Sequence, residues 1–218
     1  MTQLTPEKIH QALALNGFDA VTAQNRMMPF GPAQRVIPQD TTGLRIGAVL
    51  LLLYCRQDDI YLVLTKRRED LQAHAGQISF PGGRQEDSES LLTTALRETE
   101  EEIGIPKTAV LSLGQLTTIY IPPSGFLVHP FVGWYQNGSE PEFMPSAGEV
   151  AQIIEVPLKT LLDPKTAVQE PWDFKGHQVM VPYFAIQEHK VWGATAIMLS
   201  EFVERLRFVI RNPLTVDC

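Results

Sequence analysis

One short segment of the chain concentrates negative charge. Residues 82–105 read GGRQEDSESLLTTALRETEEEIGI, in which four of five consecutive positions are glutamate: Glu98, Glu100, Glu101 and Glu102. Carboxylates three or four positions apart on a helix repel each other and destabilise an isolated helix. A helix that keeps such a cluster usually gives it a cation to bind, so we expect a metal site here.

The apolar residues of this segment predict a helix with one buried face, from about Ser88 to Ile103. Ser88 is a candidate N-cap, and Gly104 stands where a glycine commonly ends a helix. At about 100° per residue, one sector holds the apolar side chains and Thr99: Leu91, Leu92, Ala95, Leu96, Thr99 and Ile103. We expect the site glutamates beyond the edge of this sector, clustered but not buried with the leucines.

Glycine, arginine and glutamate also recur at fixed spacings. The pattern is Gly83, five residues, Glu89, seven residues, Arg97-Glu98, two residues, Glu101-Glu102, one residue, Gly104. It resembles the Nudix box, the signature of hydrolases that cleave a nucleoside diphosphate linked to another group. A solvated acidic helix face is the alternative, but it leaves the matching glycines and arginine unexplained. One departure is Thr99, where the family usually has an aliphatic residue.

The resemblance implies a divalent metal site on this helix. Glu98 and Glu102, one turn apart, are the expected ligands of Mg²⁺ or Mn²⁺, which favour hard oxygen ligands. Glu101 is expected as a third ligand or as the base, and a backbone carbonyl of Gly82 as a further ligand. Arg97, four residues before Glu101, is expected to hold a carboxylate in position.

Hydrolysis also needs a base that takes a proton from the attacking water. Glu101 is one candidate. Glu149 is the other, because its loop, residues 146–150, occupies the place where relatives carry a late catalytic carboxylate. An ordinary loop acid is an equally good interpretation of Glu149.

A second motif precedes the box and narrows the resemblance. Residues 64–83 read LTKRREDLQAHAGQISFPGG, similar to the upstream signature of the coenzyme A pyrophosphatase branch of Nudix hydrolases. The match departs at Val63, Arg68 and Gln72, whereas residues 120–126 and 191–196 look like the same branch. Members of this branch hydrolyse coenzyme A, its esters or its oxidised forms to 3′,5′-ADP and 4′-phosphopantetheine.

The resemblance also suggests how such a substrate would be held. Lys66, Arg67 and Arg68 form a compact basic run that could bind the 3′-phosphate or the diphosphate, although a solvated turn is the alternative. His74 could hydrogen-bond a phosphate or brace its loop. The departures at Arg68 and Gln72 leave ADP-ribose or a dinucleotide as a rival substrate.

A rival of another class is a Nudix fold that senses a ligand without turning it over. Such proteins commonly lose metal carboxylates, whereas Glu98, Glu101 and Glu102 are all present.

The composition indicates which partners and compartment to expect. The net charge of −7 argues against a nucleic-acid surface. With two cysteines, no secretory signal and no apolar run long enough to span a bilayer, we expect a cytoplasmic protein.

Alternating strand and helix patterns predict an α+β fold, a mixed sheet sandwiched between helices in an α/β/α arrangement. Two regions are expected: residues 1–42, a helix from Thr5-Pro6 and an irregular extension, and residues 43–212, the Nudix domain. The helix either covers the domain or forms a homodimer contact. The other expected elements are a hairpin of 45–55 and 60–65, strands at 77–80, 110–120, 127–135, 153–156 and 179–186, and helices at 157–162 and 194–210.

Overall fold

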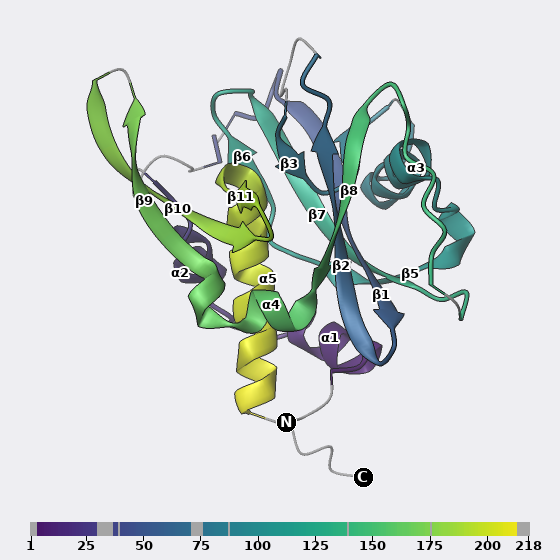
Figure 1. The fold of residues 1–218 in the computed structure, drawn as a ribbon. Coiled ribbons are helices and arrows are strands. Elements are labelled where there is room, and N and C mark those ends of the chain that lie inside the picture. Colours follow the sequence, from purple (N-terminus) through teal and green to yellow (C-terminus); the bar gives the residue numbers. More distant parts are fainter. Residues whose placement is uncertain are drawn as a thin grey trace.

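The computed structural model describes residues 4–29, 37–38, 40–70, 76–86, 88–138, 140–174 and 176–212. A mixed β-sheet lies between helices (Figure 1), which confirms the predicted fold class. Its strands are β1 (Arg45–Arg56), β2 (Asp59–Arg67), β3 (Ile78–Ser79), β4 (Gly82–Arg84), β5 (Val110–Gln115), β6 (Ile119–Ile121), β7 (Phe126–Tyr135) and β8 (Val150–Pro157). The pair β1 and β7 is parallel, and the other strand pairs are antiparallel.

The hairpin of β1 and β2 is formed as the sequence predicts. Gln57 and Asp58 connect the strands with φ angles of 48° and 67°. Two successive residues with positive φ fit the two-residue turn whose twist matches that of paired strands. This hairpin brings Arg67, at the end of β2, to the same end of the sheet as β3 and β4.

Alternation along β1 builds two cores, one on each face of the sheet. Leu51 and Leu53 belong to the core that includes α1 (Pro6–Leu13) and α5 (Gly193–Arg211). Leu50, Leu52 and Tyr54 belong to the other core, with Ala95 and Ile103 of α3 (Leu91–Ile103). Because successive strand residues point to opposite faces, one apolar strand supports both helical layers.

Two predicted elements need correction. The acidic helix begins after Ser90, whose hydroxyl accepts a hydrogen bond from the backbone N–H of Thr93 at 3.1 Å. Ser88 has a φ of 76°, so it lies in the connection before the helix. The strand expected over 110–120 is divided into β5 and β6, with a register shift where β5 pairs with β7.

The remaining elements include several that the sequence patterns did not reveal. Thr5 caps α1 as predicted, and α4 (Leu158–Leu162) and α5 are close to their expected ranges. The unexpected elements are α2 (Ala20–Asn25), the 3₁₀ turns η2 (Lys107–Ala109) and η3 (Pro164–Thr166), and a second sheet that consists of β9 (Ala167–Phe174), β10 (His177–Ile186) and β11 (His189–Val191).

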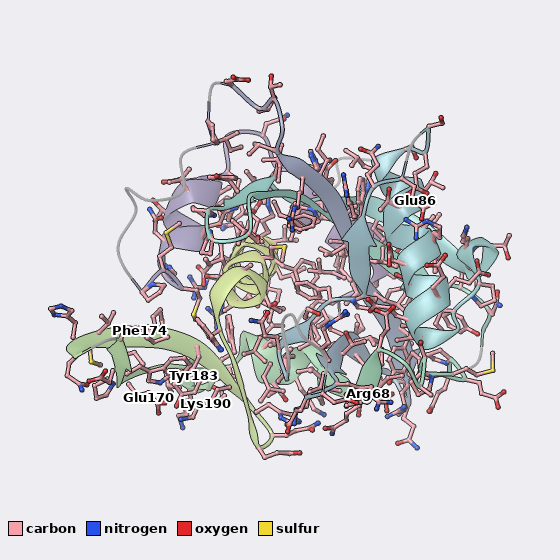
Figure 2. The ribbon with its side chains drawn as sticks, turned by 90° about the horizontal axis from the view of Figure 1, so that it is seen from above. Arg68, Glu86, Glu170, Phe174, Tyr183 and Lys190 are labelled. Atoms are coloured by element: carbon pink, nitrogen blue, oxygen red, sulfur yellow. The ribbon has the colours of Figure 1, made fainter. Side chains whose placement is uncertain are left out.

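The β9–β10 hairpin projects from the main body beside α5 (Figure 1). Glu170 accepts hydrogen bonds from Trp172 and Tyr183 and pairs with Lys190. Figure 2 shows the labelled hairpin residues far from Glu86, which lies in the approach to α3. The hairpin is therefore remote from the acidic helix.

A buried ion pair within α5 is hydrogen-bonded to the N-terminal segment. Glu201 is fully buried and accepts a hydrogen bond from Arg205 Nε at 2.9 Å. It also accepts hydrogen bonds from Gln24 and Thr117. Residues 4–25 thus share a core with the rest of the domain, and their contribution to a homodimer stays a prediction.

The described helices include none that is both long enough and apolar enough to cross a membrane. Cys55 is a free, exposed cysteine, and Cys218 lies outside the described residues.

Candidate active site

Both ends of α3 are fixed locally, and this sets the direction of its carboxylates. Ser90 caps the first turn. Gly104 ends the helix with φ 76°, and its N–H donates to the carbonyl of Glu100 at 2.9 Å. A Cβ at Gly104 would lie 2.7 Å from Cβ of Met144. Glycine is therefore required there for the backbone conformation and for close packing.

Arg97 is the centre of a network of carboxylates. Its guanidinium contacts Glu89 at 2.8 Å, Glu98 at 2.9 Å and Glu101 at 3.1 Å, and it also donates to the carbonyl of Arg84 at 3.2 Å. The planar guanidinium can hold several oxygens in a fixed arrangement. The positioning role predicted for Arg97 agrees with these contacts.

Glu89 anchors this arginine. Its carboxylate accepts hydrogen bonds from the hydroxyl of Thr94 at 2.9 Å and the N–H of Glu86 at 3.0 Å. The bond from Arg97 is the main cause that lowers the pKa of Glu89 to about 2. The basic group that pairs with Glu89 is therefore Arg97.

Glu98 lies directly over Gly82 and Gly83, the two glycines at the start of β4 that we call the glycine turn. A Cβ at Gly83 would come within 2.3 Å of the Glu98 carboxyl group, and a Cβ at Gly82 within 2.5 Å of the carbonyl of Ala48. Both glycines are therefore needed so that the backbone can pass between β1 and the helix. Desolvation raises the pKa of Glu98, while the bond from Arg97 opposes this effect.

Glu102 differs from the expectation that all the site glutamates lie outside the buried face. Its exposed fraction is only 9%. Desolvation, followed by the charges of Glu98 and Glu149, raises its pKa to about 8, and a backbone hydrogen bond from Gly82 acts in the opposite direction. At about 100° per residue, Glu102 lies only about 20° from Leu91 and so falls inside the buried sector, where the glycine turn and the 144–150 loop also cover it.

That loop explains how Glu149, distant in sequence, reaches the site. The N–H groups of Met144 and Ser146 donate to the carbonyls of Ile103 and Glu102, at 2.9 and 2.8 Å. These bonds attach the loop to the C-terminal end of α3. The carboxylate of Glu149 then contacts Nη1 of Arg67 at 3.1 Å, so two predicted site residues meet beside Glu102.

The other residues of the basic run point elsewhere. Lys66 pairs with Glu69 at 3.0 Å, and Arg68 pairs with Asp70 at 2.6 Å. Arg68, labelled in Figure 2, is also hydrogen-bonded to the carbonyl of Ala147. The pairing of β2 with β8 shifts register between Lys66 and Arg67, and Arg68 lies beyond the end of β2, so the three side chains have different partners. His74 and Gln72 lie outside the described residues.

Among the described residues, no three His, Cys, Asp or Glu side chains form a group with metal-binding geometry. The donors nevertheless fit Mg²⁺ or Mn²⁺, which need few protein ligands because water and substrate phosphates supply the others. Glu98 and Glu102 are both partly or largely buried, and the charge of Glu98 further opposes the ionisation of Glu102. A cation between them would remove this repulsion, and Glu101 is instead drawn toward Arg97.

Two contacts of the site could not be expected from spacing. The hydrogen bonds between the 144–150 loop and α3 are backbone interactions, so residue identity carries no signal for them. Thr94, which orients Glu89 through its hydroxyl, reads in the sequence as an ordinary helical residue.

Comparison with known proteins identifies the family. The family described as the NUDIX domain matches residues 44–177. The chain is 37% identical over 164 residues to the uncharacterized Nudix hydrolase NudL of Photorhabdus laumondii, covering 75% of this chain and 86% of that protein. It is 36% identical over 201 residues to the protein of the same name from Pectobacterium atrosepticum, covering 87% and 93%.

A solved structure supports the fold independently. The Nudix hydrolase RenU of M. smegmatis superposes with a TM-score of 0.51 at 13% identity, covering 80% of this chain and 90% of that one. The match of the domain and the two relatives over most of the chain lead to one conclusion: the chain belongs to the Nudix hydrolase family.

Proposed function

We propose that this Nudix pyrophosphohydrolase, whose family acts on nucleoside diphosphate derivatives, hydrolyses the pyrophosphate bond of coenzyme A or its derivatives with the aid of Mg²⁺ or Mn²⁺. The products would be 3′,5′-ADP and 4′-phosphopantetheine or its acylated or oxidised form. The observation that carries the proposal is the arrangement of Glu98 and Glu102 beside the Gly82–Gly83 turn, with Arg97 fixing Glu98.

Glu98, Glu101 and Glu102 form what we call the acidic cluster, and each residue in and around it has a separate role in the proposed reaction. When bound, the divalent cation neutralises the phosphate oxygens and activates water. Glu98 and Glu102 would bind this cation, with Gly82 contributing a backbone carbonyl. Arg97 keeps Glu98 in one rotamer and also contacts Glu101. A cluster held this way loses little freedom when the cation and the substrate bind.

The base is proposed to be Glu149 or Glu101. Glu101 is largely exposed and already accepts a hydrogen bond from Arg97. Glu149 is also exposed, lies near both buried glutamates, and is paired with Arg67. If a substrate phosphate takes over the guanidinium of Arg67, the carboxylate of Glu149 becomes free to accept a proton. This favours Glu149 when substrate is bound.

The choice of coenzyme A is supported by the motif that precedes the box. Arg67, which the motif retains, is the member of the basic run that lies beside the acidic cluster. Lys66 and Arg68 are held by Glu69 and Asp70 at the rim, where they could bind a more distant group such as the 3′-phosphate. His74 remains a candidate for the same role.

The experiment is a direct assay of cleavage. The purified protein is incubated with coenzyme A and Mg²⁺ or Mn²⁺, and 3′,5′-ADP and phosphopantetheine are separated by chromatography, beside an ADP-ribose reaction. We expect release from coenzyme A that stops with EDTA and is slow with ADP-ribose. Cleavage of ADP-ribose alone would contradict the substrate but not the class.

Matched variants separate hydrolysis from a ligand-sensing role. Glu98→Gln and Glu102→Gln should abolish cleavage. Glu100→Gln, on the same helix but paired with Lys107 on its outer side, should not. A wild-type protein that binds coenzyme A without cleaving it, with either metal, would favour the sensor.

A further inference from the structure

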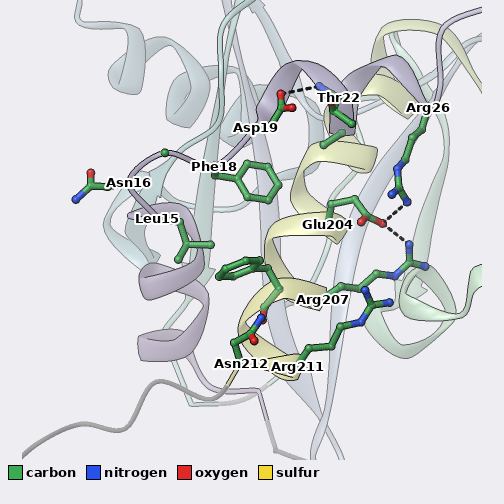
Figure 3. Close-up of a pocket in the computed structure, with 13 residues that line it drawn as sticks. Leu15, Asn16, Phe18, Asp19, Thr22, Arg26, Glu204, Arg207, Arg211 and Asn212 are labelled. Atoms are coloured by element: carbon green, nitrogen blue, oxygen red, sulfur yellow. Dashed lines mark hydrogen bonds and ion pairs between the residues drawn. The ribbon is translucent and has the colours of Figure 1, made fainter.

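A cleft lies on the helical layer opposite α3, where the connection between α1 and α2 meets the end of α5 (Figure 3). Its volume is about 380 Å³, within the range of small-molecule sites. It is lined by side chains of α2, by the α1–α2 connection, and by the last two turns of α5. Residues of α3 and of the glycine turn do not contribute to this lining.

Positive charge exceeds negative charge in this cleft. Arg26, Arg207 and Arg211 face it with only two carboxylates, Asp19 and Glu204. The lining therefore carries one net positive charge in a chain whose formal net charge is −7. A local excess of this kind attracts anions against the field of the whole protein.

Both carboxylates already have partners. Oδ1 of Asp19 accepts a hydrogen bond from the N–H of Thr22 at 2.9 Å, which caps α2. Oε1 of Glu204 contacts Arg26 at 3.0 Å and Arg207 at 2.5 Å (Figure 3). Arg207 is fixed further by the carbonyl of Leu162 at 3.1 Å. Glu204 thus holds two guanidinium groups close together without neutralising both.

The third arginine has no such partner. In the part of the chain that the structure describes, no hydrogen bond or ion pair is found for the guanidinium group of Arg211. The helix dipole stabilises a positive charge in the last turn of α5. This interaction explains why an arginine is suited to the position, but it leaves the N–H donors of the side chain without acceptors. Five N–H donors in a planar fork are suited to a phosphate.

The wall of the cleft also offers aromatic surface. Phe208, one turn before Asn212, is 46% exposed although it is large and apolar. Phe18 is occupied on one side by the guanidinium of Arg205, 4.4 Å from the ring centroid. Exposed ring surface beside unpaired guanidinium donors is the combination that a nucleotide needs, a flat base joined to a phosphate.

We propose that this cleft binds a small phosphate-bearing molecule with a flat aromatic group, of the nucleoside monophosphate class. Arg211, with Arg26, would bind the phosphate, and Phe208 would contact the base. The site is separate from the acidic cluster. Thr195, at the other end of α5, bonds to the carbonyl of Ile78 in β3 at 2.9 Å, and Phe208 lies about 20 Å further along the helix.

Calorimetric titration tests the proposal with adenosine monophosphate and inorganic phosphate as probes, at low salt and in EDTA. We expect Arg211→Gln to weaken both probes at this site by about tenfold or more. Phe208→Leu should weaken adenosine monophosphate by several-fold and leave inorganic phosphate unchanged. Lys107→Gln removes one exposed cation on the α3 side of the sheet and should change neither.

The acidic cluster could bind the same nucleotide, so Arg67→Gln distinguishes the two sites. This change should leave the Arg211-dependent binding intact. Adenosine monophosphate binding that Arg211→Gln does not weaken would overturn the proposal. Equal loss in Lys107→Gln, or no binding of this nucleotide at millimolar concentration by the folded protein, would overturn it as well.

Discussion

Two arginine–glutamate clusters occupy opposite faces of the sheet, and they are built differently. Around Arg205 on α5, one guanidinium meets one carboxylate, that of Glu201, and both are buried. Around Arg97 on α3, one guanidinium contacts three carboxylates, and Glu102 adds a fourth nearby. The first cluster is balanced in charge, whereas the second is strongly acidic.

The hydrogen bonds show the same contrast. Glu201 is surrounded by donors from Gln24, Thr117 and Arg205, and Arg205 also donates to the carbonyls of Ala12 and Leu13. The α5 cluster is complete without any ligand. The α3 cluster leaves buried negative charge, which a cation would compensate. A buried cluster whose charges are balanced indicates a structural role, and one with excess negative charge indicates a binding role.

The largest effect should come from breaking the balanced cluster. Glu201→Ala leaves Arg205 buried and unpaired, which typically costs about 3–5 kcal/mol. Urea unfolding followed by circular dichroism measures the loss. As a control, Asp59→Asn removes an exposed pair with Lys159 and should cost less than about 1 kcal/mol. A loss below about 1 kcal/mol for Glu201→Ala would show that the pair is not structural.

The second largest effect is expected in the acidic cluster, where a substitution should reduce catalysis but not stability. Glu102→Gln should lower kcat by about 100-fold or more, since a metal ion supplies several kcal/mol of stabilisation to the transition state. Without metal, the same change should leave stability equal or higher, because it replaces a carboxyl group whose ionised form is disfavoured by burial and by Glu98 with a neutral amide. Steady-state assays and urea unfolding of one preparation test both. A large loss of stability would contradict the contrast.

A smaller effect is expected from Arg97→Lys. Lysine keeps the charge but cannot hold Glu89, Glu98 and Glu101 with one planar group. Positioning contacts of this kind contribute about 10–100-fold to metal affinity or activity. The concentration of Mn²⁺ that half-activates the enzyme should rise. An unchanged Mn²⁺ dependence would show that Glu98 does not need Arg97 for its position.

Substitution of Arg67 or Glu149, which pair with each other, should change KM or kcat by about tenfold, near 1.4 kcal/mol. In a double-mutant cycle of Arg67→Gln and Glu149→Gln, the KM of coenzyme A should respond mainly to Arg67. Its kcat should respond mainly to Glu149. If both changes affect only kcat and do so additively, the two residues have no shared role in binding substrate and freeing a base.

The smallest effect is a pH dependence at Glu89. Its folded pKa, about 2, lies below the unfolded value of about 4.3. Its contribution to stability is therefore present above pH 4.3 and is lost as the pH falls toward 2. Glu89→Gln should flatten acid unfolding in this window. Glu100→Gln, outside the network, should not, and equal curves for wild type and Glu89→Gln would refute the assignment.

The sequence predicted elements whose signal is local. The continuous apolar run of β1, the cap at Thr5 and the glycine at 104 each act within a few residues, and all three were placed correctly. Ser88 and Ser90 are equally good caps by residue type. Only the backbone conformation, positive φ at Ser88 and extended at Ser90, decides between them.

The sequence did not predict features that depend on contacts between distant segments. The burial of Glu102 requires the glycine turn and the 144–150 loop on both sides of the helix. The pairing of Glu201 with Arg205 is visible in sequence as an i, i+4 pair, but its complete burial depends on α1, α2 and Thr117. No residue of β9 is buried, so this strand lacks the buried apolar face by which a strand is recognised in a sequence.

Binding of Mn²⁺, followed by electron paramagnetic resonance, tests most directly whether the acidic cluster is a metal site. Wild type and Glu100→Gln should bind Mn²⁺ with similar affinity, and Glu98→Gln should bind it at least about tenfold more weakly while remaining folded. Equal binding by all three proteins, or no binding by wild type, would contradict the assignment of Glu98 and its neighbours as metal ligands.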